Sequence, residues 1–115
     1  MTRLVLFDLD GTLTDTNAVD GECYVEAGAV ALLSRLQEEG WHLCIATGGW
    51  ATSAELKRRA AGLPEAVPIF SSDLDHTREG ILEIAIRRMR ELNGVLAYDR
   101  VRRAARRAYN RQVGL

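Results

Sequence analysis

The fold is constrained most by an alternation of short apolar runs with longer segments of helical spacing. Apolar runs occupy residues 3–8, 42–46 and 67–70, and residues that favour turns follow the first two, as is typical of buried strands. Helical segments come after these runs, over 27–37, from Thr52 to near Gly62 and over 78–92. Strands that alternate with helices predict an α/β fold with a parallel sheet and helices on both faces.

Capping residues locate the ends of two expected helices. Thr77 can cap a helix over 78–92, and Gly62 can end the preceding one. In that preceding helix, Thr52 and Glu55 have the spacing of a capping box. The core-facing stripe of the 78–92 helix is expected to comprise Ile81, Ala85, Met89 and Leu92.

Basic residues dominate the C-terminal segment 95–115. Val101 and Ala104 are part of an apolar set with helical spacing among many arginines, which predicts a basic helix, and a short strand beginning at Val95 is the alternative. Residues 1–75 hold 5 basic and 12 acidic side chains, whereas 76–115 hold 10 basic and 4 acidic ones. The basic end could contact phosphate or nucleic acid, although solvated helix faces produce the same composition.

Length and composition indicate one globular domain over residues 1–115. The chain carries 15 Lys and Arg against 16 Asp and Glu, and 47% of its residues are hydrophobic. No apolar run approaches the roughly 18 residues of a membrane span, so a cytoplasmic protein without a membrane partner is expected. Cys23 and Cys44 lack the spacing of a zinc site or disulfide framework and are expected to be small, semi-buried thiols.

Polar residues with chemical potential follow the first two expected strands. Asp8 and Asp10 come after the first strand, and Thr47 followed by two glycines comes after the second. Carboxyl ends of parallel strands are where ligands bind in such sheets. Two carboxylates can divide nucleophile and acid–base roles, and glycine N–H groups can approach an anion closely. An isolated Asp-x-Asp is also compatible with a simple Asx turn.

These same residues resemble the first two motifs of the haloacid dehalogenase (HAD) superfamily. The segment Phe-Asp-Leu-Asp-Gly-Thr-Leu-Thr-Asp over 7–15 resembles the first motif, and Ile-Ala-Thr-Gly-Gly-Trp over 45–50 resembles the second. The resemblance implies a HAD-like, Rossmann-like three-layer core. It also implies a magnesium-dependent phosphohydrolase that acts on a small phosphorylated substrate.

The resemblance further implies a role for each matching residue. Asp8 would attack phosphorus and form an aspartyl-phosphate, while Asp10 would protonate the leaving oxygen and then activate water. The Asp8 carboxylate and the Asp10 backbone carbonyl would hold Mg²⁺. Thr47 and Gly48 would bind the phosphoryl group. Arg78 fits the position of the cation that the third motif supplies, whereas Lys57 is expected to be a solvated helix charge.

Two departures from the family pattern predict an incomplete core. No match to the fourth motif, an apolar strand that ends in an acidic pair, follows Gly94. Asp73, Asp75 and Asp99 are the candidates that could complete the metal site, although the segment 71–75 favours a turn. The helical cap that many relatives insert between the first two motifs would lie near 20–30; only 21–26 resembles its start, so the cap is predicted to be absent.

Three other interpretations remain open. One is an inactive or weakly active HAD-like fragment. A second is a receiver-like phosphorylation switch, but receivers carry their phosphorylated Asp after the third strand, where this chain has Ser71. The third is an Arg-rich nucleic-acid-binding module, which is disfavoured because the segment lacks interleaved aromatic residues beyond Tyr98 and Tyr109.

Overall fold

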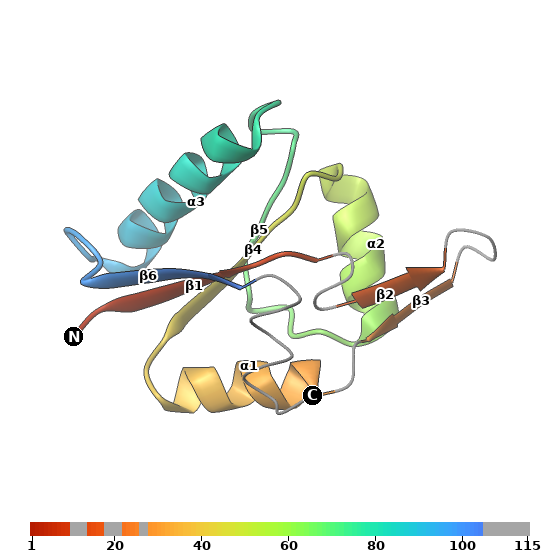
Figure 1. Ribbon diagram of the computed structural model, residues 1–115, viewed down its shortest axis with the longest axis horizontal. Coiled ribbons are helices and arrows are strands. Elements are labelled where there is room, and N and C mark those ends of the chain that lie inside the picture. Colours follow the sequence, from red (N-terminus) through yellow and green to blue (C-terminus); the bar gives the residue numbers. More distant parts are fainter. Residues whose placement is uncertain (10–13, 18–21, 26–27, 105–115) are drawn as a thin grey trace.

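A four-stranded, all-parallel sheet forms the centre of the chain. The computed structural model describes residues 1–9, 14–17, 22–25 and 28–104 (Figure 1). The strand order is β5-β4-β1-β6, where the strands are β1 (Arg3–Phe7), β4 (His42–Ala46), β5 (Ile69–Phe70) and β6 (Arg100–Ala104). The helices are α1 (Ala29–Glu38), α2 (Ala51–Ala61) and α3 (Arg78–Asn93). The expected α/β class is confirmed, and the architecture is compatible with a Rossmann-like fold.

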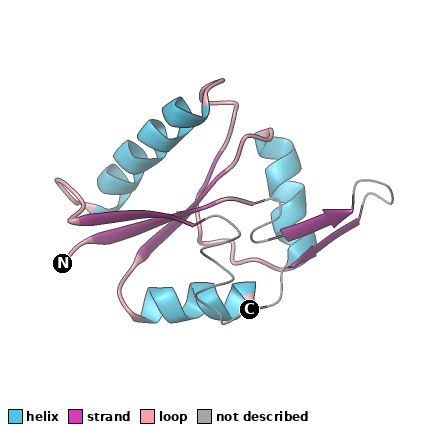
Figure 2. Ribbon diagram, viewed as in Figure 1, coloured by secondary structure: helices cyan, strands magenta, loops and turns pink. Residues whose placement is uncertain are grey.

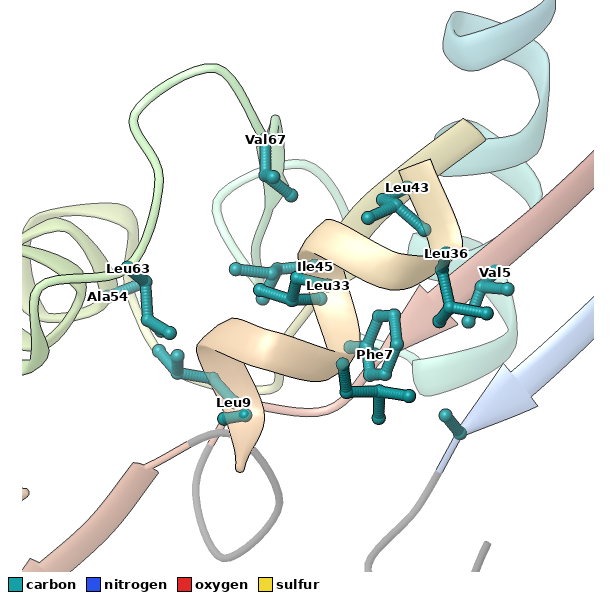
Figure 3. Close-up of a cluster of buried hydrophobic side chains, with 13 residues drawn as sticks. Val5, Phe7, Leu9, Leu33, Leu36, Leu43, Ile45, Ala54, Leu63 and Val67 are labelled. Atoms are coloured by element: carbon teal, nitrogen blue, oxygen red, sulfur yellow. The ribbon is translucent and has the colours of Figure 1, made fainter. Parts of the chain in front are cut away.

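Helices cover both faces of the sheet because successive apolar residues of β1 and β4 point to opposite faces. Val5 and Phe7 of β1 pack into a cluster with α1 and α2 (Figure 3). Leu4 and Leu6 pack on the other face against α3. β1 is therefore buried on both faces, as the uninterrupted apolar run 4–7 predicts.

The chain reverses its direction of travel across the sheet at β1. From β1 it adds β4 and then β5 on one side, and it returns to place β6 on the other side of β1. Because parallel crossovers are right-handed, the reversal puts α3 on the face opposite α1 and α2 (Figure 2). The boundary between β1 and β6 is thus a topological switch point, where ligands bind in open α/β sheets.

Residues 14–17 and 22–25 form the two strands of a β-hairpin where a loop and the start of a helical cap were expected. β2 (Thr14–Asn17) and β3 (Glu22–Val25) pair antiparallel, with Thr14 opposite Val25. Cross-strand pairing of residues with good strand propensity explains the difference for the Cys-Tyr-Val segment at 23–25. The hairpin lies beside α2 (Figure 1). Residues 22–25, within the segment 21–26 that resembles the start of a helical cap, are therefore a strand and not a helix.

The expected basic helix is wrong over residues 100–104, which form β6. The strand pairs in parallel with β1, from Arg3 opposite Arg100 to Phe7 opposite Ala104. This long-range pairing overrides the helical spacing of Val101 and Ala104, which is a purely local signal. A fourth strand is therefore present, contrary to expectation. The remainder of the expected helix, 105–115, lies outside the described residues.

The α3 helix matches its expected start but not all of its expected face. The Thr77 hydroxyl accepts a hydrogen bond from the Gly80 N–H at 3.0 Å, which confirms the cap. Ile81, Ala85 and Met89 are buried, whereas Leu92 is 67% exposed. Tyr98, from the loop before β6, packs against this end of the cluster. The Tyr98 hydroxyl lies 3.3 Å from the Met89 carbonyl oxygen, so the loop closes the core in place of Leu92.

Cys44 is a free thiol in the middle of β4, and it is fully buried where a semi-buried thiol was expected. Burial raises its pKa to about 12, so the thiolate needed for nucleophilic chemistry is not populated at neutral pH. The side chain of Cys23 lies outside the described part. Among the helices that the structure describes, none combines the length and the apolar character that a membrane span requires.

The α2 helix is capped from another loop and not by the expected capping box. Its N-cap residue is Trp50, which makes no side-chain capping bond. The Asp73 carboxylate instead accepts a hydrogen bond from the Ala51 N–H at 2.7 Å, and Glu55 pairs with Arg58. The capping-box prediction is wrong because the helix begins one residue before Thr52, so Thr52 lies within its first turn.

Replacing Asp73 with Ala is expected to lower the free energy of unfolding by about 1 kcal/mol, the usual contribution of an N-terminal cap. Thr52→Ala is the matched control and should change stability by less than about half of that. Urea unfolding of both variants measures the difference. A larger loss of stability for Thr52→Ala than for Asp73→Ala would show that the capping box, and not Asp73, stabilises the start of α2.

Hydrogen bonds between Thr2 and Asp99 join the N-terminal ends of β1 and β6. The Asp99 carboxylate accepts hydrogen bonds from the Thr2 N–H at 2.8 Å and the Thr2 hydroxyl at 3.1 Å. These bonds hold the pKa of Asp99 below its ordinary value. Because Asp8 follows the opposite end of β1, the expectation that Asp99 could complete a metal site there is wrong.

Asp99→Asn is expected to lower the free energy of unfolding at neutral pH and to have little effect at strongly acidic pH. The folded pKa is depressed, so the ionised group stabilises the fold above its unfolded pKa of about 3.9. This stabilisation is lost as the pH falls through the lower, folded value. Urea unfolding of parent and variant over this range measures the effect. A difference that persists unchanged in strong acid would rule out an ionic origin.

Candidate functional site

The ends of β1 and β4 bring the expected polar residues together. Asp8 follows β1 and Thr47 follows β4, and the two strands are neighbours, with Phe7 opposite Ile45. They border a depression of about 250 Å³ at the carboxyl edge of the sheet. Its lining consists of Asp8, Leu9, Ala46, Thr47, Gly48, Gly49 and Arg78. Four expected site residues therefore share one surface, and Asp10 lies outside the described residues.

Asp8 is held by its backbone and presents its carboxylate to the depression. Its N–H donates to the Ala104 carbonyl oxygen at 3.3 Å, which continues the β1–β6 pairing by one residue. The side chain is 22% exposed, so the carboxylate remains accessible to a ligand while its backbone is anchored between two strands. Such anchoring on a rigid strand end favours precise placement of a reacting group.

The loop after β4 forms a second wall of the site. The Thr47 N–H donates to the Phe70 carbonyl oxygen at 2.9 Å, and the Thr47 hydroxyl accepts from the Gly49 N–H at 3.1 Å. The hydroxyl proton can therefore be donated to an anion. Ser72 holds the loop from the far side, because its N–H and hydroxyl both donate to the Gly49 carbonyl oxygen. At Gly48, a Cβ atom would meet nothing within 4 Å, so the loop leaves open space above it.

Arg78 is the first residue of α3, and its guanidinium reaches the site from the face of the sheet that α3 covers. One guanidinium nitrogen lies 3.8 Å from an Asp8 carboxylate oxygen. Arg78 is 59% exposed, and such pairs usually contribute between about 0 and 1 kcal/mol to stability. The guanidinium is thus available to an incoming anion without a large loss of folding free energy.

A turn ahead of α3 fixes where the helix begins, at Arg78. The Asp75 carboxylate accepts hydrogen bonds from both the N–H and the hydroxyl of Thr77, at 2.7 and 2.8 Å. These bonds lower the pKa of Asp75. A Cβ at Gly80 would lie 2.3 Å from the Asp75 carboxyl carbon, so glycine makes room for this carboxylate. The expectation of a turn here is confirmed.

The alternative acids and the lone lysine lie elsewhere. Asp73 is engaged at the start of α2 and Asp75 in the turn before α3, so neither lines the depression. Lys57 lies within α2 and does not line it either. Within the described ranges, no group of three or more His, Cys, Asp or Glu side chains could hold a metal ion.

Arg103 is a site residue that the sequence analysis missed. It lines a narrow crevice beside the depression together with Asp8, Thr47 and Arg78. The crevice is closed by Ile81 and Leu82 of α3. Its position depends on the pairing of β6 with β1, so the helical interpretation of this segment concealed it. Alternation along a strand, applied to Arg102 and Arg103, is the signal that could have revealed it.

Comparison with known proteins adds no assignment. No model of a known protein family matches the chain, and no curated protein matches its sequence. In chain order, β5 is the third strand of the parallel sheet. It is followed by Ser71, so no carboxylate lies where a receiver domain would have its phosphorylated Asp.

Proposed function

We propose that the chain is a HAD-like hydrolase that removes the phosphoryl group from phosphomonoesters through an aspartyl-phosphate on Asp8. The observation that carries the proposal is the convergence of Asp8, Thr47 and Arg78 on one depression. These three residues come from different elements, at the positions that the two sequence motifs and the start of α3 predict. A nucleophile, a hydroxyl donor and a cation are the groups that phosphoryl transfer requires.

The two half-reactions use few groups. An Asp8 carboxylate oxygen attacks phosphorus, the bond to the leaving oxygen breaks, and Asp10 gives that oxygen a proton. Water then attacks the phosphorus of the aspartyl-phosphate while Asp10 takes its proton, and the bond to Asp8 breaks to release phosphate. The Thr47 hydroxyl and the Arg78 guanidinium hold the phosphoryl oxygens throughout. The role of Asp10 rests on the sequence resemblance alone.

The residues present are compatible with a magnesium ion, although they favour weak binding. Mg²⁺ is usually bound by one or two carboxylates together with waters and substrate phosphate. Of the described residues that line the depression, Asp8 supplies a carboxylate, and Asp10 would add its backbone carbonyl by resemblance. When bound, the ion would neutralise charge on the phosphoryl oxygens. The segment after β6, 105–115, contains no Asp or Glu to add.

Release of phosphate from an aryl phosphate tests the proposal. We expect turnover that rises with magnesium and falls when the ion is chelated, with half-saturation well above the micromolar range. Saturation at micromolar magnesium would show that a further acid completes the site. A purified, cooperatively folded chain that releases no phosphate at any magnesium concentration would reject hydrolysis and favour the inactive-fragment alternative.

A further inference from the structure

The two adjacent arginines of β6 lie on opposite faces of the sheet. Arg102 stands opposite Val5, and its guanidinium lies 5.9 Å from the centre of the Trp41 ring. Arg103 stands opposite Leu6, whose side chain packs with α3, and it lines the crevice beside Asp8. Strand alternation therefore places Arg103 on the face that carries the crevice and Arg102 on the opposite face.

The crevice that Arg103 lines lies at the topological switch point. Asp8 and Ala104 are joined there by a backbone hydrogen bond between the ends of β1 and β6. Arg103 precedes Ala104, so its side chain leaves the sheet one residue from this bond. Arg78 approaches Asp8 from the start of α3. Two arginines from different elements thus line one crevice together with the Asp8 carboxylate.

The balance of charge at this point favours an anion. Among the described residues that line the crevice, Asp8 supplies one negative charge and the two arginines supply two positive charges. A carboxylate nucleophile repels a phosphate dianion, and guanidinium groups offset that repulsion. Each guanidinium can also donate two parallel hydrogen bonds to phosphate oxygens.

We propose that Arg103 is a second phosphate-binding residue, and that Arg78 and Arg103 together hold a phosphomonoester dianion at Asp8 without a metal ion. The proposal rests on the function proposed above, because it concerns the same site. It assigns the site a preference for monoester dianions over singly charged diesters. The second guanidinium supplies part of the positive charge that a metal ion held by a further carboxylate would otherwise bring.

Binding of inorganic phosphate in the presence of a chelator tests the assignment. Calorimetry at mildly alkaline pH, where phosphate is mostly a dianion, should detect binding to the parent chain. Arg103→Gln should weaken the affinity about tenfold, the usual effect of losing a hydrogen bond to a charged group. Arg102→Gln is the matched control, since it removes the same charge from the opposite face, and should change affinity by less than about twofold.

Two further variants sharpen the result. Arg78→Gln should weaken phosphate binding by a similar factor, and Arg103→Lys, which keeps the charge, should lose less affinity than Arg103→Gln. Thermal unfolding of all four variants verifies that the exposed substitutions leave the fold intact. Equal affinity in the parent and Arg103→Gln would overturn the proposal, as would an equal loss in Arg102→Gln or no metal-free binding by the parent.

The outcomes separate this inference from the proposed hydrolysis. Phosphate binding that depends on Arg103, in a chain that never releases phosphate from an ester, would reject hydrolysis and retain the two-arginine site. Magnesium-dependent turnover with phosphate affinity unchanged in Arg103→Gln would retain hydrolysis and reject the role of Arg103.

Discussion

Asp8→Asn is expected to lower the turnover of an aryl phosphate by roughly a thousandfold or more, as removal of a nucleophile does in other enzymes. Asparagine has nearly the same shape but no anionic oxygen to attack phosphorus. The fold should persist, because Asp8 is anchored through its backbone to Ala104 and its ion pair with Arg78 is long and partly exposed. Initial rates of phosphate release measure the loss.

Asp99→Asn is the matched control for this experiment. It makes the same chemical change at the opposite end of the β1–β6 pair, where Asp99 is bonded to Thr2. Its turnover should equal that of the parent at neutral pH. Full activity in Asp8→Asn would contradict the nucleophile assignment. An equal loss in both variants would show that the loss arises from damage to the fold.

Removal of β6 is expected to abolish cooperative unfolding or to cause aggregation. A chain that ends at Asp99 leaves one edge of β1 unpaired, and Leu4 and Leu6, now almost fully buried, would lie on an exposed edge. Unpaired edges with apolar side chains invite association with other chains. Size-exclusion chromatography and thermal unfolding measure both effects.

A chain that ends at Ala104 is the control for this truncation, because it retains β6 and removes only residues 105–115. We expect it to unfold cooperatively. If both truncated chains remained monomeric and as stable as the parent, β6 would not be needed to protect β1. If both failed alike, the segment 105–115 would carry the stabilisation that we assign to β6.

Local sequence patterns predict most of the core. The apolar runs at 3–8 and 42–46 correspond to β1 and β4, and helical periodicity places α1, α2 and α3 within a few residues. Those patterns succeed because burial on one or both faces determines which residues are apolar. The hairpin strands at 14–17 and 22–25 and the strand at 100–104 depend instead on pairing between segments, which local periodicity does not encode.

The sequence also predicts part of the candidate site. Asp8, Thr47 and Gly48 follow from the rule that chemistry gathers at the carboxyl ends of parallel strands, whereas Arg78 follows only from the resemblance to the third HAD motif. Arg103 was not predictable without knowing that β6 lies beside β1. The carboxylates of Asp73 and Asp99 were candidates by composition, but each is committed to a structural hydrogen bond.

Trapping of the phosphoryl group tests the central claim most directly. The parent chain is mixed with an aryl phosphate and magnesium, quenched in acid during turnover, digested and analysed by mass spectrometry. We predict a phosphoryl group on Asp8 in the parent, and none on this peptide in Asp8→Asn. Sustained phosphate release with no phosphoryl group on Asp8 at any quench time, or with the group on another residue, would contradict the account.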